Sequence, residues 1–224
     1  MMFYLVFDFE TTGFKSKLNE NQPIPENFPT QFACQLVTPL GNVIESYDTL
    51  IKGAVQLSQW STKNCPHISI ERCNNDGITI KDLLSNILNI IGDYNCTLVA
   101  HNIEYDWDRV LVAQAFAAGI QNSDEFRQLC KYDRLCTMVH ETNRFWSCNH
   151  NKWCGPSLAK LALKNNIFFD STQAHDAMYD VNITRQCLVE IIKNQSRTYK
   201  DRTHALKKRV NEPLTFKDKC IRVI

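Results

Sequence analysis

Two carboxylates, Asp8 and Glu10, follow an apolar run in the segment FYLVFDFETTGF at residues 3–14. Successive side chains of an extended strand point to opposite sides, so residues two apart project from one face with Cα atoms about 7 Å apart. Two negative charges held that close repel each other unless a cation lies between them. Carboxylate oxygens are the ligands that Mg²⁺ prefers. The pair therefore predicts a metal site at the end of a strand.

Two further aspartates occur where the chain is expected to return beside this strand. Asp106 follows a short buried strand in LVAHNIEYDWDRV, and Asp180 lies in an amphipathic helix in AHDAMYDVNITRQCL. Four carboxylates can bracket two ions about 3.5–4 Å apart, as two-metal phosphoryl chemistry requires. Taken singly, each aspartate is better explained as a helix cap or a surface charge. The set as a whole indicates a metal site.

A histidine, His175, precedes Asp180 by five residues. A neutral imidazole with a pKa near neutrality can take a proton from an attacking water molecule. The alternative is an ordinary histidine at the start of a helix.

Three segments, FDFETTG, AHNIEYD and HDAMYD, together resemble the three motifs of the DEDDh 3′–5′ exonucleases. This DnaQ-like family contains the proofreading subunit of bacterial DNA polymerase, ribonuclease T and oligoribonuclease. The similarity extends from residue 3 to about residue 192 and includes the spacers DGIT and SLAKLALKNN. The resemblance implies a ribonuclease-H-like fold and two Mg²⁺ ions, for which Mn²⁺ can substitute. It also implies hydrolysis of the 3′-terminal phosphodiester of single-stranded DNA or RNA, with release of nucleoside 5′-monophosphates.

The same resemblance assigns roles to individual residues. His175 is the general base, and the metal ligands are Asp8, Glu10, Asp106 and Asp180. The expected substrate contacts lie beside the first two motifs: Thr11, Thr12, Phe14, His101 and Asn102. His101 and Asn102 are also explained as a hydrogen-bonding turn at a strand end. The family frequently has histidine where this chain has Asp76, so no substrate contact is carried over to that position.

The strands and helices that must position these residues follow from the hydrophobic pattern. Strands are expected at 3–8, 32–38 and 42–51, with a turn at 39–41, and further strands at 96–102 and 131–138. Amphipathic helices are expected up to residue 91, at 104–119 with Gly119 at the end, and at 156–166 and 174–194. This order predicts an α/β fold with a five-stranded mixed sheet flanked by helices. The exonuclease domain would span residues 1–194, followed by a basic tail at 195–224.

Length and composition favour one large domain, with 224 residues and 44% hydrophobic residues. No apolar run approaches the roughly 18 residues of a membrane span, and the N-terminus lacks the pattern of a signal peptide. We therefore expect an intracellular protein, cytoplasmic or nuclear, without membrane contact.

The chain has ten cysteines, which we expect to be reduced. Zinc-ligand types cluster at Cys130, Cys136, Cys148, His150 and Cys154. The cysteines of this cluster are separated by five, eleven and five residues, which is wider than the knuckle of most structural zinc sites. Buried or loop cysteines are therefore favoured over a zinc site.

A different class of function uses the same fold without catalysis. A protein module of this class would bind nucleic acid or tether a polymerase and would have no catalytic activity. All four carboxylates and the histidine are present, and clustering them without a metal would be costly, which favours the enzyme. The expected partners are single-stranded DNA or RNA 3′ ends, together with a polymerase or another replication or repair protein. The choice between DNA and RNA stays open, because it depends on contacts to the 2′-hydroxyl.

The C-terminal segment is basic: residues 193–224 contain ten Lys or Arg and three Asp or Glu. Basic side chains on phosphates release counterions, so their contribution grows as salt falls. We expect truncation after residue 194 to weaken affinity for long strands and to flatten its salt dependence, with little change in turnover on a dinucleotide. Binding titrations at several salt concentrations measure this. An unchanged salt slope with a reduced melting temperature would show instead that the tail folds back onto the body.

Overall fold

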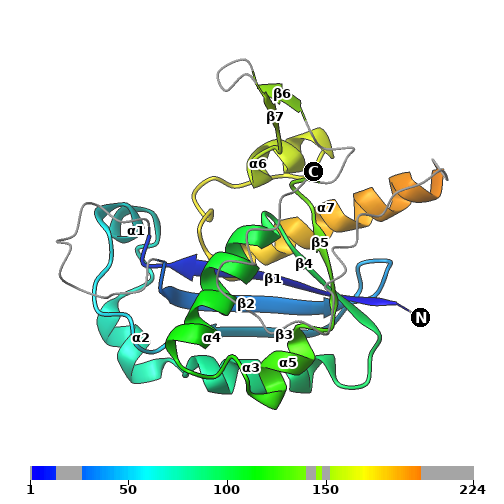
Figure 1. The fold of residues 1–224 in the computed structure, drawn as a ribbon. Helices are drawn as coiled ribbons and strands as arrows, with labels where there is room; N and C mark the ends of the chain where they lie inside the picture. Colours follow the sequence, from blue (N-terminus) through cyan, green and yellow to red (C-terminus); the bar gives the residue numbers. More distant parts are fainter. Residues whose placement is uncertain (1, 14–26, 140–144, 148–151, 198–224) are drawn as a thin grey trace.

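A mixed five-stranded sheet forms the centre of the protein in the computed structural model, which describes residues 2–13, 27–139, 145–147 and 152–197 (Figure 1). The strand order is β3-β2-β1-β4-β5. The strands are β1 (Phe3–Thr11), β2 (Pro29–Val37), β3 (Val43–Leu50), β4 (Cys96–Ala100) and β5 (Asp133–Cys136). β1 pairs antiparallel with β2 and parallel with β4, and β4 pairs parallel with β5. The predicted mixed sheet is confirmed.

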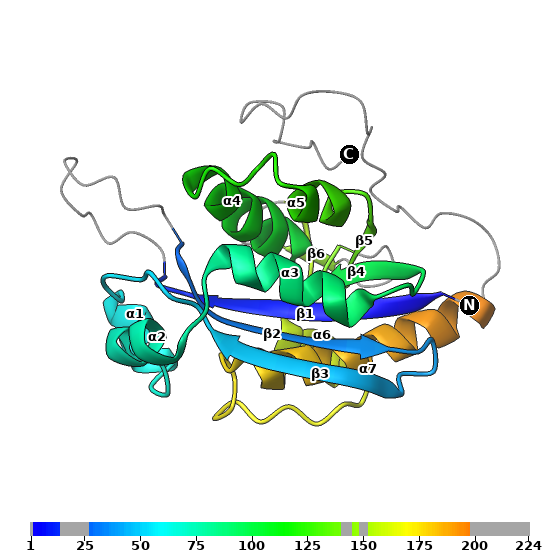
Figure 2. The same ribbon diagram turned by 90° about the horizontal axis from the view of Figure 1, so that it is seen from below.

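Helices cover both faces of this sheet (Figure 2). One face carries α3 (Ile80–Ile91), η1 (Glu104–Val112), α4 (Ala113–Ala117) and α5 (Asp124–Leu129). The other face carries α7 (Ala177–Arg197), against which α6 (Leu158–Lys164) packs. The short helices α1 (Gln59–Asn64) and α2 (Ile70–Asp76) lie beyond the end of β1, and a separate hairpin joins β6 (Phe145–Ser147) to β7 (Lys152–Cys154).

The alternation of side chains along β1 decides which face receives the carboxylates. Leu5, Phe7 and Phe9 pack in the core under α3, whereas Val6 packs against α7. Asp8 and Glu10 continue the even-numbered face, because the side-chain period of a strand is two. Both carboxylates therefore project from one face, as the spacing predicts, and this is the face on which α7 packs.

The helix expected at 104–119 is divided. Its first part, η1, is a π-helix, and the α-helix α4 follows directly. Gly119 has φ 69° and ends the helix, and the Ile120 N–H donates to the carbonyl of Ala115 (2.9 Å). The predicted end is confirmed, whereas the π-helical geometry of the first part was not predicted. π-helical turns are rare and often occur at functional sites.

Three short helices were also not predicted, although each carries a local signal. Ser58, Ser69 and Ser123 are their N-caps, and each side chain accepts a backbone N–H three residues later. The hairpin β6–β7 was not predicted either. Phe14, Cys148, His150 and the basic tail beyond residue 197 lie outside the described residues.

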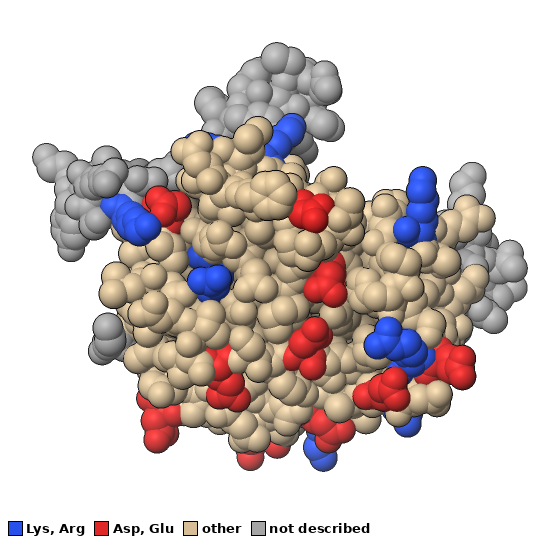
Figure 3. Space-filling model, turned by 180° about the vertical axis from the view of Figure 1, so that it is seen from behind, with Lys and Arg blue, Asp and Glu red and all other residues tan. Residues whose placement is uncertain are grey.

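The surface is of mixed charge. Figure 3 shows Asp and Glu side chains distributed over the face turned away from the viewer of Figure 1, with Lys and Arg scattered among them. Among the described helices, none combines the length and the apolar character needed to cross a membrane.

The core around β4 gives a stability prediction. Leu98 is 2% exposed at the centre of β4, so Leu98→Ala leaves a cavity beside α3. The expected loss is about 2–5 kcal/mol of unfolding free energy, measured by urea titration. Leu40→Ala is the matched control, because Leu40 is 76% exposed and should change stability by less than about 0.5 kcal/mol. Equal losses in the two variants would contradict the assigned core.

Candidate active site

A cleft of about 710 Å³ opens at the end of β1. Asp8 and Glu10 project into it from β1, Asp106 from η1, and His175 and Asp180 from the start of α7. The five residues are separated by up to 172 positions in the sequence, and the fold brings all of them to one cavity. Every predicted metal ligand and the predicted base therefore line the same space.

Asp106 is joined directly to β1. The Phe9 N–H donates to Oδ1 of Asp106 (3.2 Å), although Phe9 lies within β1. The aspartate is 3% exposed. This bond holds the carboxylate of Asp106 against β1, which carries Asp8 and Glu10. It also links η1 to the strand.

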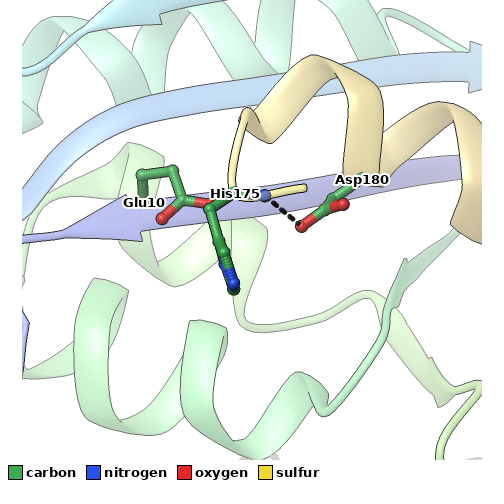
Figure 4. Close-up of side chains that lie close together, drawn as sticks. All are labelled: Glu10, His175 and Asp180. Carbon is green, nitrogen blue, oxygen red and sulfur yellow. Dashed lines mark hydrogen bonds between the residues drawn. The ribbon is translucent and has the colours of Figure 1, made fainter. Parts of the chain in front are cut away.

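The start of α7 places the histidine beside the fourth carboxylate (Figure 4). The Tyr179 N–H donates to Oδ1 of Asp176 (2.9 Å), which caps the helix. His175 precedes this cap with φ 68°, and its N–H donates to Oδ2 of Asp180 (3.4 Å). Ligand atoms of Glu10, His175 and Asp180 lie within 4.8 Å of one another.

Burial and mutual repulsion perturb the carboxylates strongly. Burial, with neighbouring negative charges as the next cause, raises the pKa of Glu10 to about 8, and burial raises the pKa of Asp106 to about 8. Burial also raises the pKa of Asp180 to about 7 and the pKa of Asp8 well above its ordinary value. The charged forms are therefore unfavourable in the absence of a compensating cation.

The donor set fits divalent cations. Oδ1 of Asp180 is buried and has no hydrogen-bond partner among the described residues. No Lys or Arg in the described part of the chain forms an ion pair with any of the four carboxylates. Oxygen ligands with unused lone pairs and uncompensated negative charge are what Mg²⁺ and Mn²⁺ bind. Asp8, Glu10, Asp106 and Asp180 are the residues that would hold them.

The predicted substrate residues next to β1 have different surroundings. Thr11 lines the cleft, and its hydroxyl lies 3.0 Å from that of Tyr105. Thr12 is not among the lining residues, and its N–H donates to the carbonyl of Phe28 (2.8 Å). Phe14 lies outside the described residues. The nucleotide contacts at Thr11, Thr12 and Phe14 stay predictions.

His101 and Asn102 line the cleft and also form a structural turn. His101 Nε2 lies 3.0 Å from the carbonyl of Pro156, which can only accept, so this nitrogen carries the proton. Nδ1 lies 3.0 Å from the hydroxyl of Thr137. Burial lowers the pKa of His101 to about 4, so the ring is neutral. Both nitrogens are thus engaged within the protein, and substrate contact at this pair stays a prediction.

Sequence reasoning missed two neutral groups, one bonded to Glu10 and one bonded to the start of α7. The Cys65 thiol donates to Oε2 of Glu10 (3.4 Å). Gln31, the register partner of Glu10 on β2, donates to Oδ1 of Asp48 (3.0 Å) and accepts the N–H of Ala177 (3.3 Å) at the start of α7. A glutamine inside an apolar strand was the available signal. The contact of Cys65 had none, because it joins residues 55 positions apart.

Comparisons with known proteins found a matching family model and a related sequence. A family model described as RNase_T exonuclease matches residues 5–188. The chain is 27% identical over 180 residues to the PolC-type DNA polymerase III of Mycoplasmopsis pulmonis (strain UAB CTIP). The aligned segment covers 80% of this chain and 11% of that protein. The chain therefore spans a small part of this relative.

Solved structures share the fold at low identity. The zinc-bound E. coli ExoI–ssDNA complex has a TM-score of 0.61 at 18% identity, covering 88% of this chain and 42% of that one. The nuclease domain of 3′hExo, described as a DEDDh family member bound to rAMP, has a TM-score of 0.64 at 13% identity, covering 86% and 92%. S. pombe Pop2p in its Mg²⁺- and Mn²⁺-bound form has a TM-score of 0.60 at 15% identity, covering 88% and 84%.

The raised pKa values predict how pH and metal ions affect stability. Carboxyl groups that titrate near 4 when unfolded and near 7–8 when folded favour the folded state below pH 4, and this contribution is lost as pH rises through 8. The low pKa of His101 reduces the stability of the folded state only below about pH 6.5, so it does not affect this comparison. The metal-free protein should therefore melt at lower temperature at pH 8.5 than at pH 6.5.

Divalent ions should reverse this loss, because they compete with protons for the same oxygens. The increase in melting temperature on adding Mn²⁺ should be larger at pH 8.5 than at pH 6.5, as measured by differential scanning calorimetry. Asp106→Asn should reduce the increase, whereas Asp93→Asn, on the exposed turn before β4, should not. An increase that is the same at both pH values would contradict the shared site.

Proposed function

The chain belongs to the RNase_T exonuclease family, and on that premise we propose that it is a metal-dependent 3′–5′ exonuclease. It would hydrolyse the 3′-terminal phosphodiester of single-stranded DNA or RNA and release nucleoside 5′-monophosphates. The observation that carries the proposal is the convergence of four buried carboxylates and one histidine on a single cleft. The first test is digestion of a 5′-labelled oligonucleotide in the presence of Mg²⁺ or Mn²⁺, which should give a ladder of labelled products shortened from the 3′ end.

The carboxylates have the role of cation ligands in this proposal. Two divalent ions held there would compensate the phosphate charge, lower the pKa of the attacking water and stabilise the leaving 3′ oxygen. Asp8 and Glu10 are fixed by the pairing of β1 with β2, and Asp106 by its bond from the Phe9 N–H. Asp180 is fixed by the first turn of α7. Each ligand therefore comes from a backbone segment that the core holds in place.

His175 would remove the proton from the attacking water. Partial burial lowers the pKa of its imidazole below the ordinary value, so the ring is neutral and able to accept a proton near pH 7. Its ligand-capable nitrogen lies within 4.8 Å of carboxylate oxygens of Glu10 and Asp180. A proton acceptor beside the cation ligands is the arrangement that general-base catalysis of hydrolysis requires.

The substrate sugar and the partner are further parts of the proposal. Solved structures of the same fold are described with ssDNA and with rAMP, so proteins of this fold bind nucleotides of both sugars. Parallel digestion of matched DNA and RNA strands measures the preference. The similarity to PolC-type polymerase supports a polymerase, or another replication or repair protein, as the partner.

Substitutions at the site should distinguish the role of the proposed general base from that of the proposed metal ligands. His175→Ala should keep Mn²⁺ binding and lower turnover by about 10²–10⁴, the usual range for a lost general base. Asp180→Asn should weaken metal binding and turnover together, with Asp93→Asn as the matched control. Turnover comes from single-strand digestion, and metal affinity from calorimetric titration. A His175→Ala variant with wild-type turnover near neutral pH would exclude this base.

The proposal also has a direct rival, the inactive module of the same fold. Intact 3′-labelled and 5′-labelled strands after incubation with Mg²⁺ or Mn²⁺ would favour that rival. Absence of Mn²⁺ binding by the wild-type protein would favour it further, because the carboxylates would then serve no cation.

A further inference from the structure

The indole of Trp60 has an unusual position on the cleft wall. Trp60 lies on α1, lines the cleft and is 52% exposed. Its ring centroid is 4.8 Å from that of His175, and the two ring planes are at 76°. This is the edge-to-face geometry that aromatic rings favour. A large apolar ring is thus kept in solvent contact next to the proposed base.

The helix that carries Trp60 is fixed to the end of β1. The Ser58 N–H donates to the carbonyl of Thr12 (2.9 Å), and the Ser61 hydroxyl donates to the carbonyl of Thr11 (3.1 Å). Gly13 has φ 86°, and a Cβ at this position would lie 2.3 Å from Oγ of Ser58. The close approach of α1 therefore depends on this glycine. Trp60 has a defined place relative to the catalytic strand.

The His175 ring has little else to hold it. Its backbone N–H is bonded to Asp180, but within the described part of the chain neither ring nitrogen has a hydrogen bond. The hydrogen bond of its N–H holds the backbone of His175, whereas χ1 and χ2 of the side chain depend on what the ring contacts. Catalytic bases are commonly oriented by a third group. The ring contact that the structure describes for His175 is the one with Trp60.

We propose that Trp60 is a positioning residue that orients the His175 imidazole toward the reacting water. This inference rests on the proposed exonuclease function. An edge-to-face contact restricts ring rotation without engaging either nitrogen, so the base stays free to accept a proton. A hydrogen-bonded partner would occupy one of these nitrogens.

Kinetics of Trp60 variants test the proposal. Trp60→Ala should lower kcat by about two- to tenfold, the range expected for a lost aromatic pair, with KM little changed. Trp60→Phe keeps a ring and should recover most of kcat. Tyr94→Ala is the matched control, because Tyr94 is 42% exposed, its ring contacts that of Phe3 in a tilted arrangement, and it does not line the cleft. A raised KM with unchanged kcat would overturn the proposal and assign Trp60 to substrate binding.

A double-mutant cycle asks whether Trp60 acts through the histidine. In the His175→Ala background, Trp60→Ala should cause no further fall in kcat. An equal fall in both backgrounds would overturn the proposal. Melting temperature and Mn²⁺ affinity of Trp60→Ala should match wild type, since α1 is held by its own backbone bonds.

An NMR measurement is independent of activity. The His175 ring protons of the metal-free protein, assigned by their loss in His175→Ala, should carry a ring-current shift that disappears in Trp60→Ala. An unaltered shift would overturn the contact on which the proposal rests. An inactive wild-type protein that shows the shift would instead mean that the contact is right and the exonuclease function is wrong.

Discussion

The mutual repulsion of four carboxylates is the constraint on which this structure depends. Asp8, Glu10, Asp106 and Asp180 share one cleft, and burial raises the pKa of each of them. No described Lys or Arg forms an ion pair with them. Ion pairs therefore cannot hold the group together. The carboxylates are brought close by packing of the segments that carry them, and their charge is left for cations to compensate.

Three elements supply this packing: the strand β1, the π-helix η1 and the α-helix α7. β1 is paired on both sides, by β2 and β4, and its two faces belong to different apolar clusters. The π-helix η1 follows β4 and returns Asp106 to the strand, where the Phe9 N–H fixes it. α7 packs its buried side chains against β1 and β2, which carries Asp180 and His175 to the same edge.

The groups that donate hydrogen bonds to the site carboxylates are neutral, and a further carboxylate, Asp176, adds negative charge nearby. Backbone N–H groups of Phe9 and His175, the Cys65 thiol and the Gln31 amide supply the hydrogen bonds around the carboxylates and the start of α7. Neutral donors orient a carboxylate without cancelling its charge, whereas a lysine or arginine would neutralise that charge. The site is therefore oriented by hydrogen bonds while its negative charge is left uncompensated by any described Lys or Arg.

The sequence by itself determined the sheet, the main helices and the candidate residues of the site, because these depend on local periodicity and on motifs. The two-residue spacing of Asp8 and Glu10 places both on one face whatever surrounds the strand, and the apolar period of α3 defines its buried side. Only the tertiary structure decided the π-helical turn at Asp106, the thiol bond from Cys65 to Glu10 and the ring contact of Trp60 with His175. These features join residues 55 to 115 positions apart or depend on the fit between a helix and the sheet, and neither propensity nor spacing encodes such contacts.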